Sequence, residues 1–202
     1  MSVIHPRVRR ALFAIAGVTC VGMFAGTGAA FASCPAQPLS TPFSQWGDSS
    51  DYFMVPGGSF EGTADATGWT LANASLTAGN EPFQVNGSGD QQTLTINAGG
   101  SATSPFFCVD DTMSNLRFFA QQITAGTSLR VRALVQTDNG VSVVPVAELA
   151  DGSMSSWAPT QTLGAGTLTN GSSLMLALRF RAPASAGSWQ IDDIYVDPYR
   201  SG

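Results

Sequence analysis

The chain has 202 residues, of which 44% are hydrophobic and 11% charged, with nine basic side chains against fourteen acidic ones. All the basic residues are arginines, and the only histidine is His5. The absence of lysine excludes a Schiff-base mechanism. Acidity without a basic tract also argues against nucleic acid as a partner.

Residues 1–32 have the pattern of a secretory signal peptide. An arginine-containing head precedes an uncharged run at residues 11–31, which closes on the small-x-small site Ala30-Phe31-Ala32. The alternative is a retained membrane anchor, which the glycine- and alanine-rich run and the cleavage site disfavour. We expect a secreted or cell-surface protein in the extracellular space, with no membrane span after cleavage.

Removal of the signal peptide leaves six arginines, fourteen acidic residues and no histidine, a net charge of −8. This excludes a Ser-His-Asp triad, a Cys-His pair and a histidine-ligated metal. Two cysteines remain, Cys34 and Cys108, and an even pair in an exported chain predicts one disulfide. The alternative is lipidation of Cys34, because residues 31–34 loosely resemble a lipobox with Phe in place of the usual Leu.

The mature chain is long enough for one domain with a sizeable core. Residues 33–56, rich in Pro, Ser and Asp, are expected to form an irregular arm. Residues 57–202 alternate short apolar segments with turn signals, which is typical of a β-sandwich. We expect about nine strands, enough for two packed antiparallel sheets.

Several segments alternate apolar and polar residues with a period of two. Such alternation predicts strands with one buried face at residues 93–96, 116–120, 129–133 and 174–181. Asp138-Asn139-Gly140 predicts a hairpin turn. Residues 141–149 are apolar on both faces, which predicts a central strand, although Pro145 indicates a bulge or an edge contact.

The last apolar segment changes phase in its middle. Trp189 and Ile191 share one parity, whereas Ile194 and Val196 share the other, and Asp192-Asp193 lies at the slip. Either both faces are buried there or a bulge redirects the chain. Two carboxylates at that point need a partner, since an unpaired charge near a core is costly.

Three segments carry a resemblance to a known family. The opening Gly57-Gly58-Ser59-Phe60-Glu61, the following Gly68-Trp69 and the closing residues 189–197 (WQIDDIYVD) resemble jelly-roll carbohydrate-binding modules of secreted bacterial glycoside hydrolases, which have a galactose-binding-like sandwich. They also resemble stand-alone secreted actinobacterial proteins with the same pattern. The resemblance spans residues 57–198 and implies an all-β, antiparallel jelly-roll sandwich.

In modules of this kind a first-strand Glu and an Asp of the closing strand often hold a structural calcium ion. By position, the resemblance implies Glu61 with Asp192 or Asp193, and backbone oxygens near Ser59 and Thr63. Calcium takes six to eight oxygen ligands, which carboxylates and strand-end carbonyls supply. The alternative is that these carboxylates face solvent or pair with arginine.

Sugar-binding sheet faces use exposed aromatic rings and planar polar side chains. Trp157 lies in a Ser-rich loop, whereas Trp69 and Trp189 are expected in the core. Five arginines lie in predicted strands, and strands of one sheet would align them to grip an acidic or hydroxyl-rich ligand. The alternative is a solvated face paired with acids. The candidate ligand-binding residues are Arg117, Phe119, Gln121, Arg130, Arg132, Arg179, Arg181 and Trp157.

These patterns favour an exported, non-catalytic module that binds carbohydrate. A cell-surface structural or protein-interaction protein is the alternative from another class. A hydrolase acting through acids alone would need two facing carboxylates in a cleft, and adjacent acids on a strand point to opposite faces.

Overall fold

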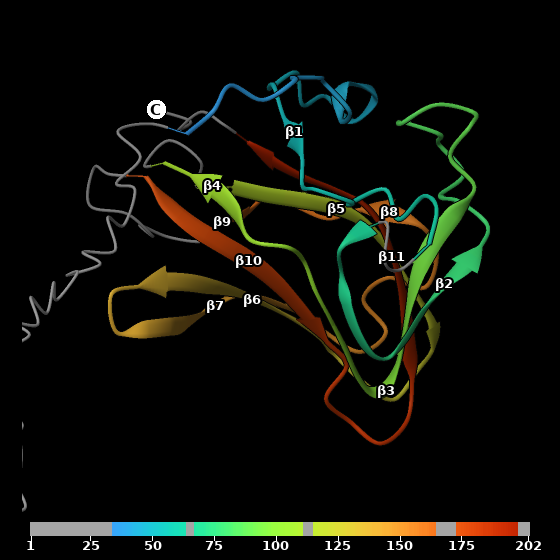
Figure 1. Cartoon of the computed structure of the whole chain (residues 1–202). Helices are drawn as coiled ribbons and strands as arrows, with labels where there is room; N and C mark the ends of the chain where they lie inside the picture. Colours follow the sequence, from blue (N-terminus) through green and yellow to red (C-terminus); the bar gives the residue numbers. More distant parts are fainter. Residues whose placement is uncertain (1–33, 64–66, 111–114, 165–172, 198–202) are drawn as a thin grey trace, which may run out of the picture.

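Figure 1 shows the computed structural model of the chain, in which residues 34–63, 67–110, 115–164 and 173–197 are described. The expected signal peptide at residues 1–32 lies outside these ranges. No helix within them is long and apolar enough to cross a membrane. The elements, in chain order, are η1 (Ser44–Trp46), β1 (Phe53–Met54), β2 (Thr70–Ala78), β3 (Gln92–Thr103), β4 (Phe107–Val109), β5 (Asn115–Thr124), β6 (Leu129–Thr137), β7 (Gly140–Leu149), β8 (Ala158–Pro159), β9 (Leu163–Gly164), β10 (Leu174–Arg181) and β11 (Ser188–Asp197).

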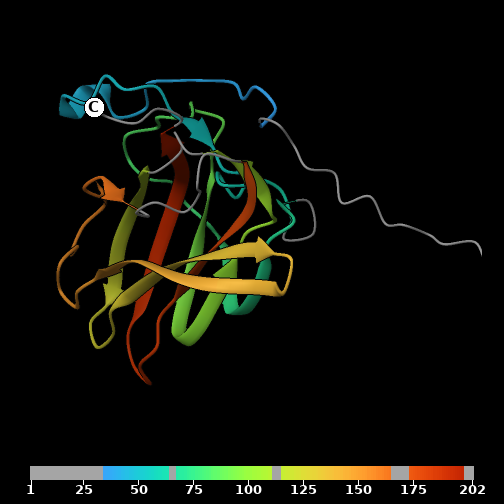
Figure 2. The same ribbon diagram turned by 90° about the vertical axis from the view of Figure 1, so that its left-hand side faces the viewer.

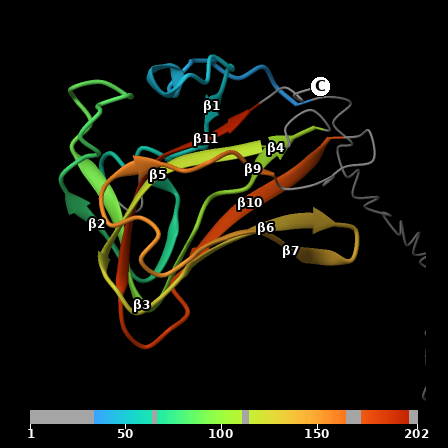
Figure 3. The same ribbon diagram turned by 180° about the vertical axis from the view of Figure 1, so that it is seen from behind.

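The strands form a curled antiparallel sheet in the order β7-β6-β10-β3-β11-β5-β8. The first half of β3 pairs with β11 and its second half with β10, so the sheet folds over into two layers (Figures 1 and 3). The first layer contains β7, β6 and β10, and the second contains β11, β5 and β8. This is the predicted all-β jelly-roll sandwich. Eleven strands lie in the described ranges rather than about nine, because β1, β4, β8 and β9 have only two or three residues.

A pair of glycines allows β3 to change layer. Gly99 has φ +74°, in the left-handed region that glycine adopts without strain. A Cβ on Gly100 would lie 2.4 Å from the carbonyl oxygen of Asn73, so a side chain here would collide with β2. The register between β2 and β3 also shifts at this point, between Ala72 and Ala74.

The core lies between the layers and consists of the alternating residues that the sequence predicts. Leu94 and Ile96 of β3 are fully buried, and each such side chain contributes roughly 1.5–3 kcal/mol to folding. Phe118 of β5 and Phe180 of β10 meet edge to face across the layers, with ring centroids 5.1 Å apart. The same core contains Trp69 and Trp189, as expected.

β7 is an edge strand, which corrects the expectation of a central one. It stands at the end of the strand order, where it pairs with β6. Val141 and Val143, whose apolar character suggested burial, are 51% and 48% exposed. The register slips beside Pro145, and an edge strand tolerates a residue that lacks an N–H.

The predicted hairpin between β6 and β7 is confirmed. Thr137 pairs with Gly140 across the two-residue turn Asp138-Asn139, and Gly140 has a positive φ of 119°. In Figure 2 this hairpin crosses in front of the strands of the second layer. It therefore presents its outer face on the side of the molecule opposite β5 and β11.

Residues 34–56, the expected irregular arm, contain η1 and β1 and pack across one end of the second layer (Figures 1 and 3). The predicted disulfide is confirmed and joins Cys34 to Cys108 beside β10. An aromatic cluster of four buried residues fixes the arm to β5 and β11. Its members are Phe43, Tyr52, Phe119 and Tyr195.

Candidate functional site

Five carboxylates converge where β11 passes the start of β3. Carboxylate oxygens of Asp90, Asp192 and Asp193 lie within 4.8 Å of one another, and all three residues are buried. Electrostatic interactions connect Glu61 to Asp90 and Glu81 to Asp193. We call these five residues the acidic cluster.

A β-bulge in β11 places two of the aspartates in the cluster. The register between β11 and β5 shifts between Asp192 and Tyr195, and Asp193 has φ 48°, which Asp tolerates better than most residues. Ile191 and Ile194 both remain fully buried although they are three positions apart. The phase slip in the sequence is this bulge, and it brings both carboxylates against the core.

The three aspartates have no cationic partner among the described residues. The ion pairs there, Arg117–Asp48 and Arg130–Glu148, lie outside the cluster. Both carboxylate oxygens of Asp193 and one of Asp90 are buried without a hydrogen-bond partner in the described ranges.

The environment therefore favours protonation of these groups. Burial, reinforced by the charges of Asp193 and Asp90, raises the pKa of Asp192 to about 10. Burial, followed by repulsion from Asp90 and Glu81, raises the pKa of Asp193 to about 8. In the absence of a cation, folding at neutral pH requires these carboxylates to take up protons, which opposes folding.

Backbone amides hold the two glutamates of the cluster. The Glu61 Oε1 atom accepts hydrogen bonds from the amides of Gln91 and Gln92, each 2.7 Å long. Although burial opposes it, contact with Asp90 and these two bonds keep the pKa of Glu61 below its usual value. Glu81 is fully buried, and its carboxylate accepts hydrogen bonds from two amides of its own loop.

The donor set of the cluster suits a hard divalent cation such as calcium. Carboxylate oxygens are the ligands that calcium prefers. A bound cation would also provide the positive partner that the buried aspartates do not have among the described side chains. The family resemblance implies Glu61 with Asp192 or Asp193. Asp90 and Glu81 are additional members that the sequence does not reveal, because a buried acid in a loop has the same local pattern as a solvated one.

The two expected backbone positions lie on the segment that carries Glu61. Ser59 is half-buried and precedes Phe60, which is fully buried with φ 58°. Thr63 is exposed, and its carbonyl oxygen accepts a hydrogen bond of 3.0 Å from the amide of Thr67. That carbonyl is therefore engaged in its own turn.

The five arginines expected on one face lie on two different layers. Arg117 belongs to β5, whereas the other four belong to β6 and β10. Arg117 therefore does not share a surface with the other four, because the curled sheet places β5 in the second layer and β6 and β10 in the first.

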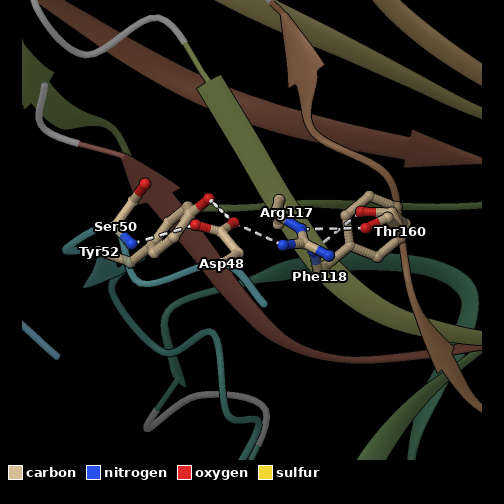
Figure 4. Close-up of polar contacts among 6 residues, drawn as sticks. All are labelled: Asp48, Ser50, Tyr52, Arg117, Phe118 and Thr160. Atoms are coloured by element: carbon tan, nitrogen blue, oxygen red, sulfur yellow. Dashed lines mark hydrogen bonds and ion pairs between the residues drawn. The ribbon is translucent and has the colours of Figure 1, made fainter. Parts of the chain in front are cut away.

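Arg117 fastens the arm to the sandwich (Figure 4). Its Nη1 donates a hydrogen bond of 2.6 Å to Asp48, and its Nε donates one of 3.0 Å to the carbonyl of Thr160. The guanidinium lies 4.1 Å over the Phe43 ring, and the Tyr52 hydroxyl donates a hydrogen bond to the same Asp48 carboxylate. With its side chain 9% exposed, Arg117 is a structural residue in this state rather than an open ligand contact.

Replacing Arg117 with Met is expected to destabilise the protein by about 2–3 kcal/mol, because the partly buried Asp48 carboxylate, whose side chain is 21% exposed, loses its charged partner. Urea unfolding of R117M, D48N and the double variant measures the coupling between the two side chains. We expect a favourable coupling of about 1–2 kcal/mol. A coupling near zero would show that the pair does not hold the arm.

The other three candidate ligand residues, Phe119, Gln121 and Trp157, are associated with the second layer. Phe119 is fully buried beneath the stacked ring of Phe43, so the arm covers it. Gln121 is half-buried and donates a hydrogen bond of 2.6 Å to the side chain of Gln190. Trp157 is also half-buried and packs against the aromatic cluster. Only Gln121 and Trp157 retain surface that a ligand could contact.

Four arginines form a separate surface on the first layer, which we call the arginine face. Across the pair of strands β6 and β10, Arg179 lies opposite Arg132, and Arg181 lies opposite Arg130. Their neighbours in sequence point into the core, as the alternation predicts. Arg132 and Arg181 are exposed, and Arg130 and Arg179 are partly exposed.

The first layer is hollowed beside the arginine face. The hollow has a volume of about 570 Å³ and includes the exposed side chains of Val141, Val143 and Phe106, the last 38% exposed. Arg179 of the arginine face also lines it, and the lining contains no carboxylate. The complete lining is Gly68, Thr70, Thr103, Ser104, Pro105, Phe106, Leu134, Val141, Val143 and Arg179.

The chain matches no protein-family model and no curated protein sequence. Among solved structures, it is similar to the CBM22-1–CBM22-2 tandem domain of Paenibacillus barcinonensis Xyn10C, at 13% identity over 84% of this chain and 49% of that chain, with a TM-score of 0.51. The single CBM22-1 xylan-binding domain of the same protein gives 12% identity over 83% of this chain and 100% of that chain, with a TM-score of 0.49. The Clostridium thermocellum Xyn10B CBM22-1–GH10 modules, complexed with xylohexaose, give 15% identity over 71% and 28% of the two chains, with a TM-score of 0.48. At these identities the likeness concerns the jelly-roll fold.

Proposed function

We propose that the chain is an exported, non-catalytic module that binds carbohydrate in the hollow of the first layer. The observation that carries this proposal is the composition of the hollow. The exposed Phe106 ring and the apolar Val141 and Val143 suit the apolar face of a sugar ring, whereas Arg179 and Thr103 suit its hydroxyl groups. A few polar groups among apolar walls are typical of a site for a small ligand.

The absence of acids from the hollow supports binding rather than hydrolysis. A glycosidase needs two carboxylates flanking the scissile bond, about 5–10 Å apart. The lining contains none, and the carboxylates of the acidic cluster that lie close together are buried. The similarity in fold to a CBM22 tandem domain also supports a binding module, although fold alone does not determine function.

The acidic cluster, in this proposal, holds a structural calcium ion. Asp90, Asp192 and Asp193 would be its carboxylate ligands, with Glu61 beside them. When bound, calcium would supply positive charge that ties β11 to the loop before β3. None of the residues lining the hollow belongs to the cluster, so the ion would stabilise the fold without contacting the sugar.

An extracellular location fits the disulfide between Cys34 and Cys108. Disulfides persist in oxidising compartments and are rare in the cytosol. Residues 1–32 would direct export as a cleaved signal peptide.

Replacing Phe106 with Ala is expected to weaken glycan binding about tenfold, because an exposed ring in contact with a sugar contributes about 1–1.5 kcal/mol. Isothermal titration calorimetry with neutral and acidic oligosaccharides measures the change. The matched control is Phe83→Ala, because Phe83 is 37% exposed and does not line the hollow.

The result could contradict the proposal in two ways. Equal loss of binding in F106A and F83A would place the ligand elsewhere on the sandwich. Failure of the unmodified protein to bind any oligosaccharide at millimolar concentration would favour the protein-interaction alternative, in which Phe106, Val141 and Val143 form an apolar contact patch.

A further inference from the structure

The arginine face is a two-by-two array of like charges. Arg132 and Arg179 face each other across β6 and β10, and so do Arg130 and Arg181. Neighbouring strands lie about 5 Å apart, and like charges directly opposite each other destabilise a sheet. The fold therefore maintains an arrangement that is unfavourable by itself.

Little within the described residues neutralises this array. Arg130 forms an ion pair of 3.2 Å with Glu148, and both side chains remain substantially exposed, at 43% and 50%. The Arg179 Nε atom donates a hydrogen bond of 3.1 Å to the Thr103 hydroxyl, which carries no charge. One acid among four arginines leaves a positive surface on a chain whose net charge is −5.

We propose that the arginine face binds the carboxylate groups of a polyuronate, a polysaccharide whose sugars carry carboxylic acids. The inference rests on the proposed function and names the class of glycan. A guanidinium group binds a carboxylate through two parallel hydrogen bonds. Four guanidinium groups on two paired strands could therefore bind several carboxylates that repeat along one polysaccharide chain.

The surroundings of the array favour a polyuronate over other polyanions. On the next strand, Ser101 pairs with Arg181, and Thr103 pairs with Arg179, which places hydroxyl side chains beside the guanidinium groups. Sugar hydroxyls can pair with them, and a polyuronate keeps its ring hydroxyls, whereas sulfate esters consume hydroxyls. Recognition of single-stranded nucleic acid relies on several stacking aromatic rings, and the hollow beside the array contains one, Phe106.

Titration calorimetry at constant calcium tests this with short oligomers of galacturonic, glucuronic and mannuronic acid, each paired with its uncharged methyl ester. We expect at least one acid to bind at least tenfold more tightly than its ester, and the difference to shrink at high salt. The double variant R132Q/R181Q changes two exposed side chains, so it should fold normally, and it should weaken binding of the acid about tenfold.

The matched variant Glu148→Gln removes the acid that competes for the array, and it should tighten binding about twofold. Equal affinities for the acid and its methyl ester would overturn the inference, and so would binding of neutral sugars alone. Both results would leave the proposed function intact. No binding of any oligosaccharide would overturn both. Binding of the acid that R132Q/R181Q leaves unchanged, or tighter binding of a sulfated oligosaccharide or a DNA duplex, would also overturn the inference.

Discussion

Removal of calcium with a chelator is expected to lower the free energy of unfolding by about 4 kcal/mol relative to the protein with calcium at 1,000 times its dissociation constant. The expectation follows from the proposed calcium site. Asp90, Asp192 and Asp193 lie buried within 4.8 Å of one another, and the described ion pairs do not reach them. Differential scanning calorimetry with and without calcium measures the change.

The effect of calcium should also depend on pH in a defined direction. Burial and neighbouring charges raise the pKa values of Asp192 and Asp193 to about 10 and 8, above the ordinary 3.8. Groups with a raised pKa stabilise the fold fully below their unfolded pKa, and that contribution is lost as pH rises through the folded pKa. The calcium-free protein should therefore lose stability between about pH 4 and pH 10, and the calcium-dependent gain should grow over the same range because calcium needs ionised carboxylates.

The variant Asp193→Asn distinguishes stabilisation by calcium bound at the acidic cluster from a general effect of added salt. Asn tolerates the positive φ of 48° at this position, so the bulge should persist. In chelator at neutral pH the variant should be more stable than the unmodified protein, because Asn enters the buried cluster without taking up a proton. In calcium it should be less stable, because a ligand is gone. If calcium stabilised both proteins equally, Asp193 would not be a ligand of the ion.

Reduction of the disulfide between Cys34 and Cys108 is expected to destabilise the protein by about 4 kcal/mol, equivalent to roughly 10 °C in melting temperature. The two cysteines are 74 residues apart, and a cross-link over so long a loop removes much entropy from the unfolded chain. Thermal unfolding with and without reductant, followed by circular dichroism, measures the shift.

The double variant C34S/C108S is the control for this measurement. It should match the reduced protein and show no response to reductant. The arm should stay folded on the sandwich, since Phe43 and Tyr52 are buried against Phe119 and Tyr195 independently of the disulfide. A melting temperature unchanged by reduction would show that this packing alone holds the arm.

The strands and the core follow closely from the sequence pattern. In a strand, side chains two positions apart lie on the same face. Leu94 and Ile96 have this spacing, and so do the leucines of residues 174–181. The phase slip at Asp192-Asp193 also marks the place of the bulge, although the slip alone is equally compatible with a strand buried on both faces. Local spacing determines these features, so no knowledge of distant contacts is needed.

Features that depend on the assembly of distant segments do not follow in this way. Val141 and Val143 suggested a buried strand, yet β7 lies at the edge, where the exposed valines border the hollow. Arg117 and Arg130 both lie between apolar residues of a strand, so their local sequences look alike. In the fold, however, the arm covers Arg117 and not Arg130. Glu81 joins the acidic cluster from a loop, and only the folded chain brings that loop to β11.

The division of the arginines between the two layers gives them different roles. Arg117 forms an ion pair with Asp48 of the arm. Its guanidinium group cannot form two parallel hydrogen bonds with a ligand unless the contact with the arm is broken. Of the remaining four arginines, Arg179 lines the hollow together with Phe106 and Thr103, which in our proposal would supply stacking and hydroxyl contacts. Charged and neutral contacts with a sugar chain would therefore be made on one side of the first layer.

Chemical-shift mapping by NMR shows directly whether a glycan binds on the first layer, in the hollow and on the arginine face. The ¹⁵N-labelled protein, saturated with calcium, would be titrated with an oligosaccharide that binds in calorimetry. We expect the largest shifts on residues of the hollow and the arginine face, including Thr103, Phe106 and Arg179. Shifts concentrated instead on Gln121, Trp157 and Gln190 of the second layer would contradict binding on the first layer.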